Sequence, residues 1–382
     1  MNILDLLQSI FGGLQFTWAN AVMLLIGAAL VSLAIVKEYE PVLLLPIGFG
    51  CILANLGMSV YHEESFLRVL YQAGIETELF PLLIFIGVGA MIDFRPLLAQ
   101  PQMVLLGAAG QFGIFGALIL ATLLGFPLNE AASIGVIGAI DGPTAIFVTS
   151  KLAPELLGPI AVAAYSYMSL IPIIQPPIMR LMTSRKERLI RMEYAPRPVS
   201  NRTVVAFPIV VTIAISLLAP AAAPLIAALM LGNLLKESGV VERLNKAAQN
   251  EIINITTLFL GLAIGATMTA EKFLYDPQTG FQVRTLGIMV LGLLAFILDT
   301  VAGLTFGKMM AFFSGGKINP LIGACGISAF PMAGRLSARA ALDEDPDNFI
   351  LMHAMGSNTA GQLGSVIAGG VLLAIVSKML GL

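Results

Sequence analysis

Long stretches without a charged side chain recur along the whole chain and limit its possible folds more than any other feature. Ten such runs can be marked off: Ala21–Val36, Pro41–Tyr61, Leu79–Ile92, Leu97–Asn129, Leu156–Met179, Val204–Leu235, Ile253–Ala270, Thr285–Leu298, Ile318–Gly334 and Phe349–Ser377. Only 12% of the 382 residues are charged, whereas a soluble domain has about 25%. Because a helix needs about 20 mostly apolar residues to cross a bilayer, we expect an all-α polytopic membrane protein with roughly ten to twelve membrane segments.

Several other functions are disfavoured by composition. Two histidines and two cysteines are too few for a metal cluster, and Cys51 and Cys325 lie in apolar runs where a free cysteine behaves as a small hydrophobic residue. A net charge of −2 gives no indication of nucleic-acid binding. Residues 1–15 lack a basic region and a cleavage site, so we expect an amphipathic surface segment there and no removable signal peptide.

The distribution of charge predicts the orientation of the chain and a broken membrane segment. Seven of the 21 Lys and Arg residues fall within residues 180–202, which places this loop in the cytoplasm by the positive-inside rule. The acidic stretch "HEESFLRVLYQAGIETE" is then outside. This orientation allows only one of the segments Ala131–Ser150 and Leu156–Met179 to cross. Asp141-Gly142-Pro143 is the expected break, because proline removes a donor and glycine permits non-helical dihedral angles.

The two halves of the chain are similar in sequence. "IGVGAMID" at Ile86 matches "LAIGATMT" at Leu262, and residues 129–139 match residues 319–329. The alignment places Ser166 opposite Asn358. We therefore expect two repeats of opposite orientation, residues 16–179 and 203–376, joined by the basic loop. Many secondary transporters have this architecture, with the binding site where broken helices meet.

Four polar islands interrupt the apolar segments: "GAIDGPTAIF", "AAYSYMSL", "INPLIGACGISAFPMAGR" and "GSNTAGQLGS". An ionisable residue at bilayer depth costs at least about 2.5–3.5 kcal/mol, which makes Asp141 a functional candidate. The islands contain one carboxylate, hydroxyls and carboxamides. Such hard oxygen ligands suit a monovalent cation, and we expect a site for Na⁺ or H⁺.

Simpler explanations exist for some of these residues. Asp141 could serve only as the N-cap of the helix that starts at Pro143, and Gly356–Gly370 could serve only for helix packing. Tyr165 or Tyr167 could be an interface anchor. Asp299 is a possible second acidic site. From the residues alone, the conclusion is an inverted-repeat, cation-coupled transporter.

The polar islands resemble a known family. "GAIDGPTAIFVTSKLAPELLGPIAVAAYSYMSLIPIIQPPIMR", "NPLIGACGISAFPMAGR" and "GSNTAGQLGSVIAGG" are similar to the β subunit of the sodium-pumping, biotin-dependent decarboxylases, and the resemblance covers nearly the whole chain. It implies that Asp141 is the essential Na⁺-linked acid and Tyr167 a functional tyrosine. It also implies functional roles for the remaining matched positions, Asn319, Gly323, Ser328, Arg335 and Asn358.

The resemblance implies a membrane subunit that decarboxylates carboxybiotin and couples this reaction to Na⁺ export across the bacterial inner membrane. Its partners would be a carboxyltransferase α subunit, a biotin carrier, a small membrane subunit and further β copies. Arg335 would bind carboxybiotin, while Tyr167 and Ser328 would deliver a proton. The expected Na⁺ ligands are Asp141, Ser166, Asn319, Ser328 and Asn358. The short amino-terminal region favours an acyl-CoA decarboxylase, and the alternative function is a free-standing Na⁺/solute symporter.

Overall fold

The computed structural model describes residues 17–38, 41–193, 198–276 and 280–381, so the segment expected at residues 1–15 lies outside the described residues. Within these ranges the chain is helical apart from one small antiparallel sheet, β1 (Tyr275–Asp276) with β2 (Gly280–Phe281). The prediction of an all-α membrane protein is confirmed.

Seven helices in the described ranges are long and apolar enough to cross a membrane: Trp18–Val36, Pro41–Met58, Pro101–Leu123, Asn201–Leu218, Glu242–Gly265, Val283–Phe313 and Leu351–Leu380. The number rises to nine if two bent helix pairs are counted as spans. The expected ten to twelve segments included apolar runs that the structure divides into shorter helices. Helices of 9 to 11 residues are too short to cross a bilayer, which needs about 20.

The chain forms two compact units. Unit 1 comprises residues 1–77 and 257–287, and unit 2 comprises residues 78–256 and 288–382. Both units draw on both halves of the chain, so neither predicted repeat forms a unit by itself, and the inverted repeat stays a prediction. Two of the three boundaries fall inside helices, α16 (Ile253–Gly265) and α18 (Val283–Phe313), and the third lies between Thr77 and Glu78.

Unit 1 packs three apolar helices closely against one another. Its elements are α2 (Trp18–Val36), α3 (Pro41–Leu53), η1 (Ala54–Met58), α4 (Phe66–Tyr71), η2 (Gln72–Glu76), the later part of α16, α17 (Ala270–Phe273) and the small sheet. A Cβ on Gly27 would lie 2.8 Å from the Gly48 carbonyl oxygen, and one on Gly265 would lie 2.1 Å from that of Ile47. Glycine therefore lets α2 and α16 approach the α3 backbone, as small residues commonly do in membranes.

Unit 2 contains the remaining elements: α5 (Leu79–Met91), α6 (Arg95–Ala99), η3 (Pro101–Met103), α7 (Val104–Ala109), α8 (Phe112–Leu123), α9 (Leu128–Val136), η4 (Ile137–Ala139), α10 (Gly142–Leu152), η5 (Pro154–Leu156), α11 (Leu157–Met182), α12 (Arg185–Arg188), α13 (Asn201–Leu218), η6 (Pro220–Ala222), α14 (Ala223–Glu237), α15 (Glu242–Ala247), η7 (Ala248–Ile252), most of α18, η8 (Pro320–Cys325), α19 (Met332–Leu342) and α20 (Leu351–Leu380).

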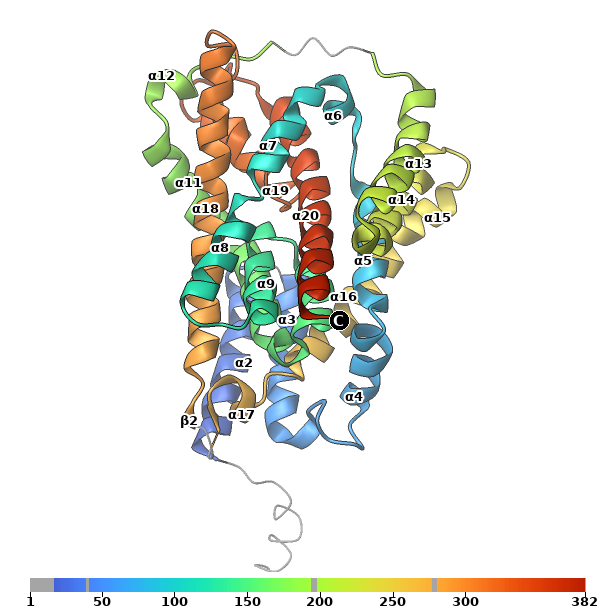
Figure 1. Cartoon of the computed structure of the whole chain (residues 1–382), viewed down its shortest axis with the longest axis vertical. Coiled ribbons are helices and arrows are strands. Elements are labelled where there is room, and N and C mark those ends of the chain that lie inside the picture. Colours follow the sequence, from blue (N-terminus) through green and yellow to red (C-terminus); the bar gives the residue numbers. More distant parts are fainter. Residues whose placement is uncertain (1–16, 39–40, 194–197, 277–279, 382) are drawn as a thin grey trace, which may run out of the picture. The chain divides into compact units, whose positions relative to one another are not determined.

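Helix α20 is central to unit 2. It contacts α6, α7, α9, α10, α14, α19 and η8 (Figure 1). Many of its buried residues are small or polar, including Ser357, Asn358, Thr359 and Ser365. A membrane helix buried on several sides can thus bring polar groups to several short helices at once.

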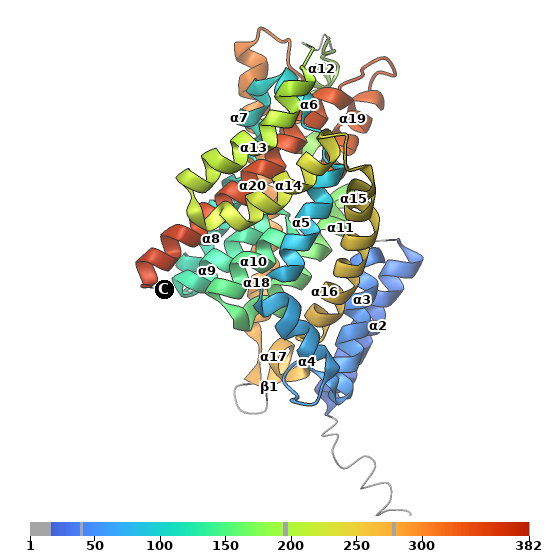
Figure 2. The same ribbon diagram turned by 90° about the vertical axis from the view of Figure 1, so that its right-hand side faces the viewer.

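Two pairs of short helices are each separated by a non-helical segment that contains a polar residue. Helices α9 and α10 lie in contact (Figure 2) and are separated by η4, Ile140 and Asp141. Ile140 has φ 51° and ψ 44°, a left-handed conformation that β-branched residues rarely adopt. The break expected at Asp141 is therefore confirmed. The second break runs from Gly326 to Pro331, between η8 and α19.

The basic loop docks onto the connection between α19 and α20. Arg188 pairs with Glu344 at 2.7 Å, and Arg191 pairs with Asp345 at 2.6 Å. The hydrogen bond from Arg188 lowers the pKa of Glu344 below its usual 4.5, and that from Arg191 lowers the pKa of Asp345 below its usual 3.8. We call this set of ion pairs the loop latch.

Candidate functional site

Asp141 begins α10 and lies at the centre of the candidate site. It is 5% exposed, and its Oδ1 atom accepts a hydrogen bond from the Thr144 backbone N–H at 3.3 Å, the pattern of a helix N-cap. Pro143 follows in the first turn, where proline fits a helix. The capping role considered for Asp141 is therefore real, but it occupies only one of the two carboxylate oxygens.

The other oxygen, Asp141 Oδ2, accepts three side-chain hydrogen bonds. Ser328 Oγ lies 3.0 Å from it, Gln362 Nε2 lies 2.9 Å from it, and Ser365 Oγ lies 3.0 Å from it. The two serine hydroxyls are also 2.7 Å apart. We call Asp141, Ser328, Gln362 and Ser365 the carboxylate cluster. It joins the start of α10, the second break and α20 through buried polar contacts, which have to be satisfied within the protein.

One face of α20 supplies most of the polar partners. Asn358, Gln362 and Ser365 are spaced i, i+4 and i+7, so they lie on the same side of a helix. The Asn358 amide nitrogen donates to the Ile327 carbonyl oxygen at 2.8 Å and to that of Cys325 at 3.3 Å. Its Oδ1 atom is buried and has no hydrogen-bond partner among the described residues. α20 therefore holds the second break in place and leaves one carboxamide oxygen available.

The two tyrosines of "AAYSYMSL" have different surroundings. Tyr165 lies against the start of α10, since a Cβ on Gly142 would be 2.1 Å from its ring. Tyr167 donates a hydrogen bond to the Met289 carbonyl oxygen on α18, and its ring packs against Gly292. Both rings are buried. Tyr165 is thus the tyrosine that touches the residue after Asp141.

The other predicted site residues contact different groups. Asn319 is buried, and its amide nitrogen donates to the carbonyl oxygens of Arg188 at 3.0 Å and Ile190 at 2.9 Å. Its side-chain oxygen caps η8 through Leu321 N–H. Ser166 is half-buried on α11 and makes no hydrogen bond to the carboxylate cluster among the described residues. The structure therefore brings together Asp141 and Ser328, with Asn358 on the adjoining face, whereas Asn319 binds the basic loop.

Arg335 lies in the first turn of α19, seven positions after Ser328. Its side chain is exposed and forms no ion pair with the described residues. A guanidinium in this state can bind an incoming carboxylate through two parallel hydrogen bonds.

Sequence reasoning missed Gln362 and Ser365. Both are inside "GSNTAGQLGS", and their helical spacing from Asn358 was a usable signal once Asn358 was chosen. Gly323, a further position matched by the resemblance, packs against α18, because a Cβ there would be 2.1 Å from the Gly303 carbonyl oxygen.

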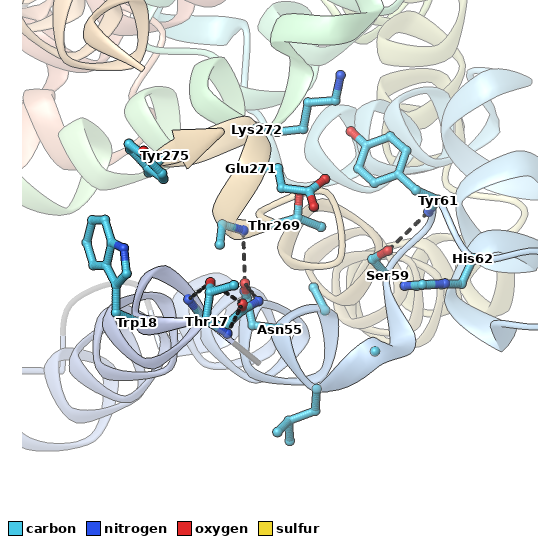
Figure 3. A pocket seen from close by; sticks show the side chains of 15 residues that line it. Thr17, Trp18, Asn55, Ser59, Tyr61, His62, Thr269, Glu271, Lys272 and Tyr275 are labelled. Atoms are coloured by element: carbon cyan, nitrogen blue, oxygen red, sulfur yellow. Dashed lines mark hydrogen bonds between the residues drawn. The ribbon is translucent and has the colours of Figure 1, made fainter. Parts of the chain in front are cut away.

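Unit 1 contains a separate cavity of about 1030 Å³ (Figure 3). It is lined by polar and aromatic side chains, among them Trp18, Asn55, Tyr61, Glu271 and Tyr275. Asn55 donates to the Met268 carbonyl oxygen at 2.8 Å and accepts from Ala270 N–H at 2.9 Å. None of the predicted site residues lines this cavity, since all of them belong to unit 2.

The carboxylate cluster has the composition of a site for an alkali cation. No group of three or more His, Cys, Asp and Glu residues that could hold a metal ion occurs in the described ranges, so a multi-carboxylate divalent site is not seen there. The cluster offers one carboxylate with hydroxyl and carboxamide groups, and such hard oxygen donors suit Na⁺.

Comparison with known proteins identifies the family. The family model for the Na⁺-transporting oxaloacetate decarboxylase beta subunit matches residues 19–376. The chain is 53% identical to the glutaconyl-CoA decarboxylase subunit beta of Acidaminococcus fermentans, over 96% of this chain and 95% of that protein. It is also 53% identical to the methylmalonyl-CoA decarboxylase subunit beta of Veillonella parvula, over 96% of each. Identity to the oxaloacetate decarboxylase beta chain 2 of Salmonella typhi is 46%, over 99% of this chain and all of that protein.

These matches extend over nearly the full length of the chain and of its relatives. Family membership implies Na⁺, a biotin-linked substrate and a complex with carboxyltransferase and biotin carrier subunits. The chain therefore belongs to the family of Na⁺-transporting decarboxylase beta subunits and is a translocase subunit of the bacterial inner membrane that couples carboxybiotin decarboxylation to Na⁺ transport.

Proposed function

We propose that the carboxylate cluster is the Na⁺ site of this subunit and that Na⁺ binding there controls the release of CO₂ from carboxybiotin. The observation that carries the proposal is the position of Asp141 Oδ2, which accepts hydrogen bonds from two serines and a glutamine at a helix break. A carboxylate inside a membrane protein is costly and is a functional candidate by default.

Oxygen atoms near Asp141 support the choice of cation. Ser328 Oγ and Ser365 Oγ already lie 3.0 Å from the carboxylate, and Asn358 Oδ1, which has no partner in the described part of the chain, lies on the same face of α20. One carboxylate with neutral oxygens balances one positive charge, which favours Na⁺ over a divalent ion. Ser166 and Asn319 stay predicted ligands from sequence.

Arg335 is the proposed recognition group for the carboxylate of carboxybiotin. It is exposed and lies in the first turn of α19, directly after the second break that contains Ser328. The Arg335 guanidinium would orient the carboxylate and offset its charge.

The chemistry requires one proton. The bond between the ureido nitrogen and the carboxyl carbon breaks, CO₂ leaves, and the nitrogen takes up the proton. Ser328 is hydrogen-bonded to Asp141, and Tyr167 is the tyrosine that the family resemblance matches to a functional position. We assign proton delivery to Ser328 or Tyr167, whose hydroxyl would pass on a proton that enters the site as Na⁺ leaves it, so that CO₂ release is linked to Na⁺ release outside the cell.

Alternating access would come from movement of the broken helices. The cluster joins α10, the second break and α20, so a shift of any one of them separates Asp141 from some of its partners. Inverted-repeat transporters commonly rock or shift one part against another around a midplane site, and the sequence similarity between the two halves supports the same build here.

The assembly that we propose is an acyl-CoA decarboxylase complex. Identity is higher to the glutaconyl-CoA and methylmalonyl-CoA relatives, at 53%, than to the oxaloacetate relative, at 46%. The partners would be a carboxyltransferase α subunit, a biotin carrier, a small membrane subunit and further β copies.

The test is CO₂ release from free carboxybiotin by the purified complex, titrated with Na⁺. We expect saturable Na⁺ activation that Asp141→Asn abolishes. The matched control is Asp93→Asn, because Asp93 is an exposed carboxylate paired with Arg95. Full Na⁺ activation in Asp141→Asn would overturn the assignment of the site.

A further inference from the structure

Asp299 is a second buried carboxylate in unit 2 that the proposed site does not use. It lies on α18 and is 0% exposed. Its Oδ1 atom accepts a hydrogen bond from the Gly113 backbone N–H, and its Oδ2 atom has no hydrogen-bond partner among the described residues. A group that is this costly to bury needs a reason for its presence.

Gly113 belongs to a membrane span that is broken in the middle. The span Pro101–Leu123 includes α7 and α8, which are separated by Gly110 and Gln111. Gln111 is the N-cap residue of α8 but makes no side-chain capping bond. Asp299 supplies an acceptor from another helix, at an end where free N–H groups and the helix dipole favour a carboxylate.

The contact between α8 and α18 depends on glycine. A Cβ on Gly113 would lie 2.2 Å from the Ala295 carbonyl oxygen and 2.5 Å from the Asp299 carboxyl carbon. A larger residue at position 113 would therefore push the start of α8 away from Asp299.

The break in this span is connected to both sides of the carboxylate cluster. Gln111 Nε2 donates to the carbonyl oxygens of Gly326 at 3.2 Å and Gly361 at 3.4 Å. Gly326 is two residues before Ser328, and Gly361 is next to Gln362. On the other side, a Cβ on Gly138, three residues before Asp141, would be 2.9 Å from Gly113.

We propose that Asp299 is a positioning residue for the Na⁺ site. Its carboxylate holds the start of α8, which keeps Gln111 between the second break and α20 and so fixes the distances from Ser328 and Gln362 to Asp141. The inference rests on the proposed function of the carboxylate cluster, but Asp299 itself binds neither Na⁺ nor carboxybiotin.

The test measures Na⁺ activation of CO₂ release by the purified complex carrying Asp299 variants. Asp299→Ala leaves a buried N–H without its acceptor, and we expect the half-saturating Na⁺ concentration to rise about tenfold. The maximal rate should stay within about twofold, because the groups that touch the substrate are unchanged. Asp299→Asn keeps an acceptor oxygen and should restore a half-saturating concentration close to that of the unaltered protein.

Two further variants separate this effect from general damage to the fold. Gln111→Leu breaks the link at its other end and should also raise the half-saturating Na⁺ concentration. Thr300→Val is the matched control, because Thr300 is buried on α18 beside Asp299 and, within the described ranges, its hydroxyl bonds only to Phe296 of its own helix. Thermal unfolding of each complex shows whether it is folded.

Two results would overturn the inference. Unchanged Na⁺ activation in folded Asp299→Ala and Gln111→Leu complexes would mean that the contact does not position the site. An Asp299→Asn complex that behaves like Asp299→Ala would mean that the negative charge is required, as in a carrier of protons or cations. Asp141→Asn in the same assay isolates the proposed function, because retained activation there would reject that function itself.

Discussion

Gln362 Nε2 lies 2.9 Å from Asp141 Oδ2, across 221 positions of sequence. This contact joins the first polar island, which contains Asp141, to the last one, which lies on α20. Helix α20 therefore forms one side of the candidate site.

Ser365→Ala should weaken Na⁺ activation, because the variant removes an oxygen 3.0 Å from the carboxylate. We expect the half-saturating Na⁺ concentration to rise roughly tenfold, on the scale of a hydrogen bond to a charged group. The control is Thr359→Val, since Thr359 is buried on α20 and its hydroxyl bonds, among the residues that the structure describes, only to Gly356 of that helix. A lowered half-saturating concentration would mean that the Ser365 hydroxyl competes with the cation.

Gln362→Glu should change the preferred ion. A second carboxylate beside Asp141 would suit a divalent cation better than Na⁺, so we expect Ca²⁺ to inhibit the variant complex at concentrations that leave the unaltered complex active. Na⁺ titrations with and without Ca²⁺ measure this. Equal sensitivity to Ca²⁺ in both complexes would argue against Gln362 as part of the cation site.

Gly142→Ala should inactivate the subunit. The added Cβ would lie 2.1 Å from the Tyr165 ring, so the ring or the start of α10 has to move, and Asp141 moves with it. Overpacking of this kind costs about 1–3 kcal/mol. Gly116→Ala is the control, because its Cβ would meet only the end of the Leu298 side chain, at 3.0 Å. CO₂ release from both variants is the measurement, and normal activity in Gly142→Ala would show that the site tolerates the shift.

The loop latch should be insensitive to pH above about 5. Glu344 has its pKa lowered by the hydrogen bond from Arg188, and Asp345 by that from Arg191. A lowered folded-state pKa means that the stabilisation is complete above the unfolded value, near 4.5 or 3.8, and is lost as the pH falls through the folded value. Trypsin cleavage after Arg188 and Arg191, divided at each pH by the cleavage rate of an unstructured reference peptide, should therefore be equally slow from pH 5.5 to 8.

Arg188→Ala should open the same loop at neutral pH. The Arg188 side chain is 13% exposed and bonds to both Glu344 and Thr183, whereas the Arg185 side chain is 74% exposed and pairs with Glu344 at 3.3 Å. We expect faster trypsin cleavage in Arg188→Ala and nearly unchanged cleavage in Arg185→Ala. Equal rates in the two variants would mean that the latch does not hold the loop.

The membrane class and the break at Asp141 could be predicted because composition and Gly-Pro chemistry act locally. The number of spans could not be predicted, because the sequence of a charge-free run does not show whether it forms one long helix or two short ones. Asn319 shows a related limit. A buried carboxamide in an apolar segment can bind a cation or tie down a loop, and only the fold reveals that its amide reaches Arg188 and Ile190.

Gln111 and Asp299 were harder to assign for another reason. Their contacts are to backbone groups of other helices, which leave no pattern in the neighbouring sequence. The partners of Asp141 on α20 were easier to predict, since helical spacing from Asn358 leads directly to Gln362 and Ser365.

The hydrogen bonds to Asp141 Oδ2 have a consequence for how fast the site can exchange its contents. The Gln362 amide points a hydrogen at this oxygen, and the two serine hydroxyls share their hydrogens between it and each other, whereas a cation needs lone pairs pointing inward. A serine hydroxyl reverses its polarity by rotating about one bond, with its oxygen left in place. Two of the three neighbours can therefore switch between an arrangement for the empty site and one for the filled site within the time of a side-chain rotation, far faster than a helix can shift.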